Sequence, residues 1–191
     1  MTANYRQLII TTLRDPKGGA KQAQKFSLPR TGLLMLAALV CLLGSIFTSV
    51  QIELFPTDET STFPLGMISP FSITIYSFLS FAILILGTFL VGKIFGGQGT
   101  LETTLFNLTL IQTIMVGIQI LNIVAGIVLP ASISSWIGIA GFIYFVFLFC
   151  IFVAELHKFR SPLMVFLGSI GFFLILILIL GSVVVWLMAS V

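Results

Sequence analysis

Charged side chains are scarce in this sequence. Asp, Glu, Lys and Arg together make up 8% of the 191 residues, whereas 58% are hydrophobic and the mean hydropathy is +1.19. Soluble domains carry roughly a quarter charged residues, so the polar groups here are too few to cover a globular surface. The composition excludes an ordinary soluble domain and predicts an integral membrane protein.

The side chains that metal sites and acid–base catalysis require are also few. Cys41 and Cys150 fall inside apolar runs, which favours buried thiols over a disulfide. The single histidine, His157, lies between Glu155 and Lys158. The i, i+3 spacing of Glu155 and Lys158 favours a surface ion pair, and we expect His157 to be a solvated residue at the membrane interface. The sequence therefore predicts no catalytic, cofactor or metal site and no enzyme.

Long uncharged runs define the membrane spans. A crossing takes about 20 apolar residues. Pro70 and Pro162 suit helix starts, and Pro130 divides the longest run because proline disfavours helix in the residue before it. Five spans result, at about 31–50, 71–92, 103–129, 131–154 and 162–191. The predicted fold is all-α and polytopic, with residues 1–30 as a basic N-terminal segment and residues 31–191 as a five-helix membrane domain.

The orientation follows from the nine Lys and Arg residues. They lie in residues 1–30, between the second and third spans, and between the fourth and fifth spans. Five crossings place these three segments on one side, which the positive-inside rule makes cytoplasmic. The N-terminus is thus predicted to be cytoplasmic and the C-terminus to be outside.

The N-terminal segment begins with a short amphipathic pattern. Its helical face consists of Tyr5, Leu8, Ile9, Thr12 and Leu13. The following "DPKGG" is expected to end that helix. Basic flanking residues favour a helix on the lipid surface, where each Lys or Arg contributes about 1 kcal/mol. A plain cytoplasmic tail and a partner-docking surface are the alternatives.

The third span is the most polar, although no ionisable residue lies in the middle of any span, which disfavours an ion-coupled transporter. Its polar and small residues recur at helical spacing: Thr109, Gln112, Gln119, Asn122 and Gly126. Such a face is typical of a seam in which amides hydrogen-bond to neighbouring helices. The alternative is a pathway for a solute.

The stretch "KIFGGQGTLETT" resembles a phosphate-binding loop at first sight. Its lysine precedes the glycines, however, and no strand precedes the lysine, so it lacks the P-loop pattern. We expect a tight turn in which Gly96, Gly97 and Gly99 permit positive φ and Thr100 caps the next helix. The exposed start of that helix could hold a lipid phosphate. No nucleotide or nucleic-acid partner is expected.

Two short motifs carry a family resemblance. Asp15–Pro16 in the N-terminal segment and Gly96–Gly97–Gln98–Gly99 after the second span, together with five spans, resemble the Ypt-interacting-protein (Yip) family in its bacterial form. Family members often have a proline within the third span, where this chain has Gln112 and Thr113.

The resemblance transfers no catalytic residue, because none is agreed for the family. Eukaryotic relatives bind Rab-type GTPases and reticulon-like proteins and act in vesicle traffic and membrane shaping, whereas no settled role or catalytic residue transfers from bacterial relatives. We expect a membrane scaffold or adaptor in a bacterial inner membrane, with lipids and another membrane protein or a second copy as partners. The alternative is a facilitator or channel for a small neutral or lipidic solute.

Overall fold

The computed structural model describes residues 4–26, 28–55 and 69–171, and all regular structure in these ranges is helical. The helices are α1 (Tyr5–Arg14), α2 (Pro16–Ala23), α3 (Arg30–Leu54), α4 (Pro70–Ile94), α5 (Leu101–Val128), α6 (Ala131–His157) and an unlabelled helix, Pro162–Gly171. The loop predicted after the first span falls largely on residues 56–68, outside the described ranges. So do residues 172–191, which hold most of the predicted fifth span.

Four of the described helices are long and apolar enough to cross a membrane: α3, α4, α5 and α6. The 28 residues of α5 extend about 42 Å at 1.5 Å per residue, more than the roughly 30 Å hydrocarbon thickness. The helices begin and end where the sequence indicates. Pro70 occupies the first turn of α4, and Leu129 is extended before Pro130 at the start of α6. The first four predicted spans are therefore confirmed as helices.

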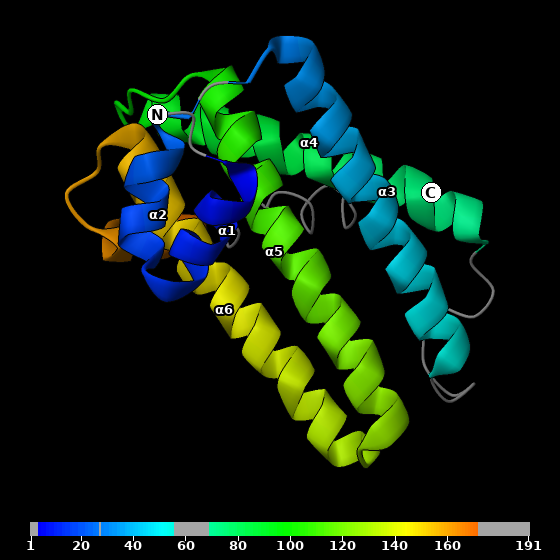
Figure 1. Cartoon of the computed structure of the whole chain (residues 1–191). Helices are drawn as coiled ribbons and strands as arrows, with labels where there is room; N and C mark the ends of the chain where they lie inside the picture. The colour runs from blue at the N-terminus through cyan, green and yellow to red at the C-terminus, as the bar shows by residue number, and fades with distance from the viewer. Residues whose placement is uncertain (1–3, 27, 56–68, 172–191) are drawn as a thin grey trace, which may run out of the picture.

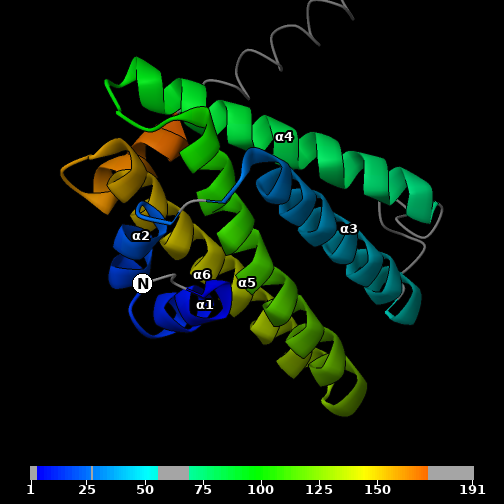
Figure 2. The same cartoon turned by 45° about the horizontal axis from the view of Figure 1, so that its top comes forward.

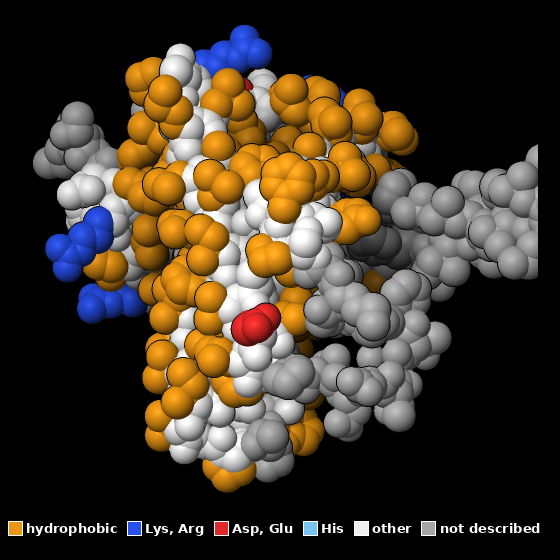
Figure 3. All heavy atoms as spheres, turned by 90° about the vertical axis from the view of Figure 1, so that its right-hand side faces the viewer, with side chains coloured by type: hydrophobic (Ala, Val, Ile, Leu, Met, Phe, Trp, Pro, Cys, Tyr) orange, Lys and Arg blue, Asp and Glu red, His pale blue; other side chains and the backbone are white. Residues whose placement is uncertain are grey.

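Helix α5 lies at the centre of the bundle, between α3 and α6. Figures 1 and 2 show α5 and α6 side by side as an antiparallel pair, with α4 packed on α3 and α5. Buried side chains of α5 and α6 form the core: Phe106, Leu108, Leu110, Ile111, Ile114, Leu148 and Phe152. Outward-facing side chains are mostly apolar, and Figure 3 shows one such face, with Lys and Arg at its edges. This surface is suited to lipid.

The N-terminal segment contains a second helix, α2, that was not predicted from the sequence. The motif "DPKGG" ends α1, as expected, but Pro16 and the two glycines then form the first turns of α2. Helices α1 and α2 pack on one another, and α2 packs on α6 (Figure 1). We call residues Tyr5–Phe26 the N-terminal pair.

Candidate functional site

Charged residues at the ends of four helices lie at one end of the bundle. Lys93 at the end of α4, Glu102 at the start of α5 and Lys158 just after α6 lie at this end, together with Arg30 at the start of α3. We call it the basic end. The last residues of the N-terminal pair, Gln24 to Phe26, lie beside Glu102 at this end, whereas Asp15–Pro16 lies in the corner between α1 and α2.

Asp15 and Pro16 form the corner between α1 and α2. The Asp15 carboxylate accepts a hydrogen bond from the Gly18 backbone N–H at 3.0 Å, and Pro16 occupies the first turn of α2. An acidic N-cap followed by proline suits a helix start, because proline has no N–H to leave unpaired there. Gly19 allows the second contact: a Cβ at this position would overlap Thr12 of α1. The corner is therefore both capped and closely packed.

Tyr5 connects this pair to the membrane helices. Its hydroxyl lies 2.8 Å from the Thr113 hydroxyl in α5, and its ring contacts Phe106 edge-on at 6.4 Å between centroids. Phe26 stacks on Phe106 at 5.2 Å, and Leu8 is fully buried. Burial raises the pKa of Tyr5 above its ordinary value, and the hydrogen bond with Thr113 offsets part of that rise. These contacts hold the N-terminal pair against α5.

The apolar face of α1 does not lie on lipid as the leading sequence interpretation expected. Tyr5, Leu8 and Ile9 pack in the protein core, and Thr12 is fully buried against α2. This face packs against protein because α2 and α5 provide aromatic and aliphatic contacts for it. Leu13 is the exception, with 51% of its surface exposed. The exposed side of α1 consists of Arg6, Gln7, Ile10, Leu13 and Arg14.

The glycine turn between α4 and α5 encloses the His157 side chain. A Cβ at Gly92 or Gly97 would overlap the imidazole, and one at Gly99 would lie 2.9 Å from its Cε1 atom. Among these glycines Gly96 alone has positive φ, at 78°. Gly97 and Gly99 are thus required for space, which differs from the expectation of positive φ at all three positions.

The Thr100 side chain caps the helix that follows this turn. It accepts a hydrogen bond from the Thr103 N–H at 3.2 Å, and the Thr103 hydroxyl accepts one from the Thr100 N–H at 3.0 Å. This reciprocal pair satisfies two donors at the start of α5. The turn and its cap are thus accounted for by helix geometry.

His157 is not the solvated residue that the sequence suggested, because 2% of its surface is exposed. Its ring stacks on Phe159 at 5.5 Å. The Thr88 backbone lies near the ring, but neither ring nitrogen makes a well-formed hydrogen bond within the described chain. The predicted ion pair is confirmed, with Lys158 Nζ 3.0 Å from Glu155 Oε1. The glycines that surround the His157 ring lie about sixty positions away in the sequence, so no local pattern predicts its burial.

The polar residues of α5 divide between two neighbouring helices. Gln119 donates a hydrogen bond to the Thr48 hydroxyl in α3 at 2.9 Å. Gln112 also faces α3, since a Cβ at Gly44 would lie 3.4 Å from its Nε2 atom. Gly126 faces Phe55, just after α3.

The other two members of the predicted face lie elsewhere. Asn122 faces α6, where a Cβ at Gly138 would lie 3.4 Å from its amide nitrogen. Thr109 is fully buried and donates to the Leu105 carbonyl at 2.7 Å, within its own helix. The structure thus brings Gln112, Gln119 and Gly126 to the α3 interface and directs Asn122 to α6.

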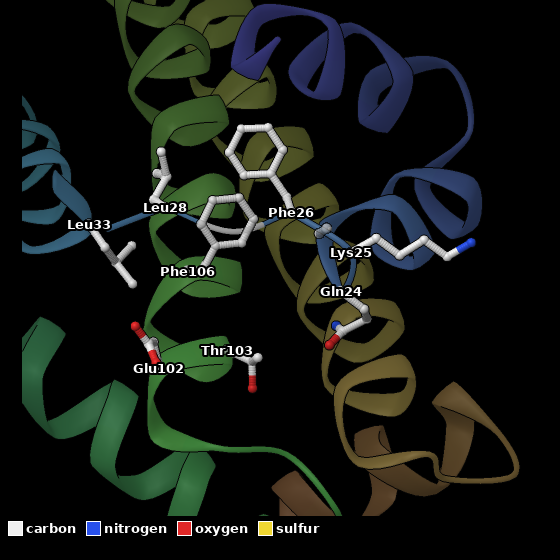
Figure 4. A pocket seen from close by; sticks show the side chains of 9 residues that line it. Gln24, Lys25, Phe26, Leu28, Leu33, Glu102, Thr103 and Phe106 are labelled. Carbon is white, nitrogen blue, oxygen red and sulfur yellow. The ribbon is translucent and has the colours of Figure 1, made fainter. Parts of the chain in front are cut away.

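A cavity of about 270 Å³ opens at the basic end, between the N-terminal pair and the starts of α3 and α5. Its lining includes Gln24, Phe26, Leu33, Glu102 and Phe106. Figure 4 shows Glu102 and Gln24 on opposite sides of Thr103, with the Phe106 ring above them and the Lys25 ammonium, also part of the lining, pointing away from Glu102. We call this the Phe106 cavity. Elsewhere, within the ranges that the structure describes, no three His, Cys, Asp or Glu residues gather as a metal site would require.

The fold defines a polytopic α-helical membrane protein whose N-terminal pair is packed on its membrane helices. The family model of the Yip1 domain matches residues 10–183, nearly the whole chain. The chain belongs to the Yip1 domain family. Comparison with curated proteins and with solved structures gave no match.

Proposed function

We propose that this protein is a non-enzymatic scaffold of a bacterial inner membrane, which uses its N-terminal pair to hold another membrane protein beside the bilayer. The observation that carries the proposal is the attachment of this pair to α5 through Tyr5, Thr113 and Phe106. Because the pair is fixed rather than tethered, its outer residues are presented in a constant geometry. Fixed geometry lowers the entropy cost of binding.

The outer face of the pair has the composition of a contact surface. Exposed basic residues extend along both helices, and apolar side chains lie among them: Arg6, Ile10, Leu13, Arg14, Lys17 and Lys21. In the described residues their side chains make no ion pair. A cationic face with apolar residues suits an acidic protein segment, and the adjacent anionic leaflet would strengthen its attraction to the membrane.

The solute pathway receives less support. The Gln119 amide is engaged by Thr48, and neither the Phe106 cavity nor the 190 Å³ cavity beside Thr48 and Phe55 is lined by Gln112 or Gln119. A hydrogen-bonded amide between two helices is typical of a seam. We therefore prefer the scaffold.

The test is a pull-down of the tagged full chain from membranes in a mild maltoside detergent. Arg6→Glu with Arg14→Glu should release a stoichiometric partner that the wild type retains. The matched control, Lys93→Glu with Arg160→Glu, makes the same charge change at the basic end but outside the N-terminal pair. Loss of the partner from both variants alike would mean general electrostatic attraction and would contradict the proposal.

A further inference from the structure

The Phe106 cavity is lined by an exposed carboxylate, that of Glu102, and by a buried amide donor without a partner, that of Gln24. Glu102 makes no ion pair in the part of the chain that the structure describes. Gln24 Nε2 is buried and has no hydrogen-bond partner there. A buried donor without a partner costs free energy unless a ligand or water satisfies it. The cavity therefore offers a negative acceptor and a neutral donor to one small molecule.

The position of the cavity indicates where such a molecule would come from. Leu33, one turn into α3, lines it, and Arg30 begins that helix. The 25 residues of α3 extend about 38 Å, which exceeds the roughly 30 Å hydrocarbon thickness. The first turn of α3 therefore lies at the depth of the lipid headgroups, and lipids are the ligands at highest local concentration there.

We propose that the Phe106 cavity binds the headgroup of a zwitterionic, amine-bearing phospholipid. The ammonium pairs with the Glu102 carboxylate beside the Phe106 ring, because a cation is attracted to a carboxylate and to an aromatic face. Gln24 Nε2 donates to a phosphate or ester oxygen. Leu33 lies against the start of the acyl chains.

The size and charge of the cavity favour the headgroup of a zwitterionic lipid. Small-molecule pockets usually measure about 300–1,000 Å³, so 270 Å³ suits a headgroup and not a whole lipid. Lys25 also lines the cavity, but its ammonium points away from Glu102 (Figure 4), so an anionic headgroup would bring its net negative charge next to that carboxylate. Lipid binding at this cavity is independent of the scaffold function and needs no protein partner.

Native mass spectrometry of the full chain in a maltoside detergent tests the proposal. The probes are phosphatidylethanolamine and phosphatidylglycerol with identical acyl chains. The headgroup of the first ends in an ammonium group, whereas the second carries an uncharged glycerol in its place and is anionic overall. The wild type should prefer phosphatidylethanolamine by about tenfold, the size expected of one charge-assisted contact. Glu102→Gln should abolish the preference. The matched control, Glu53→Gln, removes an exposed carboxylate at the other end of α3 and should retain it.

One further variant and one competition measurement make the result decisive. Gln24→Leu should weaken the binding of both lipids, since both carry the phosphate and ester oxygens that the Gln24 amide would contact. Glycerophosphoethanolamine, which has the headgroup without acyl chains, should compete poorly. The proposal would be overturned if the wild type bound the two lipids equally, or if Glu102→Gln kept the preference. It would also be overturned if Gln24→Leu bound both lipids as the wild type does, or if glycerophosphoethanolamine competed at the same concentration. A thermal midpoint for each variant verifies that it is folded.

Discussion

The imidazole of His157 occupies the space that a side chain at Gly97 would fill. The first residue belongs to the end of α6 and the second to the turn between α4 and α5. The Gly-Gly-x-Gly motif is explained by this contact together with the turn itself. Gly96 supplies positive φ, whereas Gly97 and Gly99 supply room for the ring.

We predict that Gly97→Ala destabilises the protein by about 1–3 kcal/mol, the usual cost of forcing extra volume into a packed site. Gly87→Ala is the matched control, because a Cβ there meets no atom within 4 Å. Alanine in that helix should be neutral or stabilising by up to about 1 kcal/mol. Unfolding in mixtures of maltoside and dodecyl sulfate measures both.

A double-mutant cycle links the effect to His157. Replacing His157 by alanine removes the ring that the new methyl group would meet. The combined Gly97→Ala and His157→Ala variant should therefore lose less stability than the sum of the two single changes. Strict additivity would mean that the glycine is required for another reason.

Sequence patterns predicted the four long described helices, α3 to α6, well because their cause is local. The helices coincide with the uncharged runs of the sequence. Their starts and ends lie at Pro70, Pro130 and Thr100, each of which acts on the residues next to it. The chain order of basic residues also placed Lys93 and Lys158 at one end. The predictions for His157 and Gly97 were wrong because the neighbours of these two residues are distant in the sequence.

The N-terminal pair shows the same limit. Amphipathicity identified the buried face of α1, but the pattern cannot distinguish lipid from protein as the apolar surroundings. The contact between Tyr5 and Thr113 joins residues over a hundred positions apart. In contrast, α2 had a local signal that was read only as a helix stop: an acidic residue followed by proline is a typical helix start.

Tyr5 should respond to alkaline pH. Burial raises its pKa in the folded protein, so the neutral phenol is favoured by folding. The resulting stability is fully present below the ordinary tyrosine pKa of about 10 and is lost as the pH rises through the higher folded value. The difference in thermal midpoint between wild type and Tyr5→Phe should therefore shrink above about pH 10.

The same variant provides a neutral-pH measurement. Tyr5→Phe keeps the ring contacts with Phe26 and Phe106 but removes the hydrogen bond to Thr113, which should cost about 0.5–1.5 kcal/mol. Ultraviolet titration of the two proteins would assign the phenol that is missing in the variant. Titration of that group at or below its ordinary pKa would contradict the burial of Tyr5.

Asp15→Ala should loosen the corner of the N-terminal pair. Removing the N-cap carboxylate that accepts from Gly18 costs about 1 kcal/mol, as for other N-caps. The loss should be local, so hydrogen exchange should speed up in α2 and remain slow in α5. Lys17→Ala, a neighbouring exposed change without a capping bond, is the control, and equal acceleration in both would exclude a capping role.

The hydrogen bond between Gln119 and Thr48 allows a direct test of the α5 seam. Gln119→Leu and Thr48→Val should each weaken the contact between α3 and α5, and a polar bond between membrane helices contributes about 0.6–2 kcal/mol. Because each change removes the same bond, the double variant should lose less than the sum of the single losses. Asn122→Leu paired with Thr48→Val is the control cycle, since Asn122 faces α6 and should add independently. The seam interpretation would be wrong if the Gln119 cycle were additive and if reconstituted vesicles passed small neutral solutes in a Gln119-dependent way. The amides would then line a pathway.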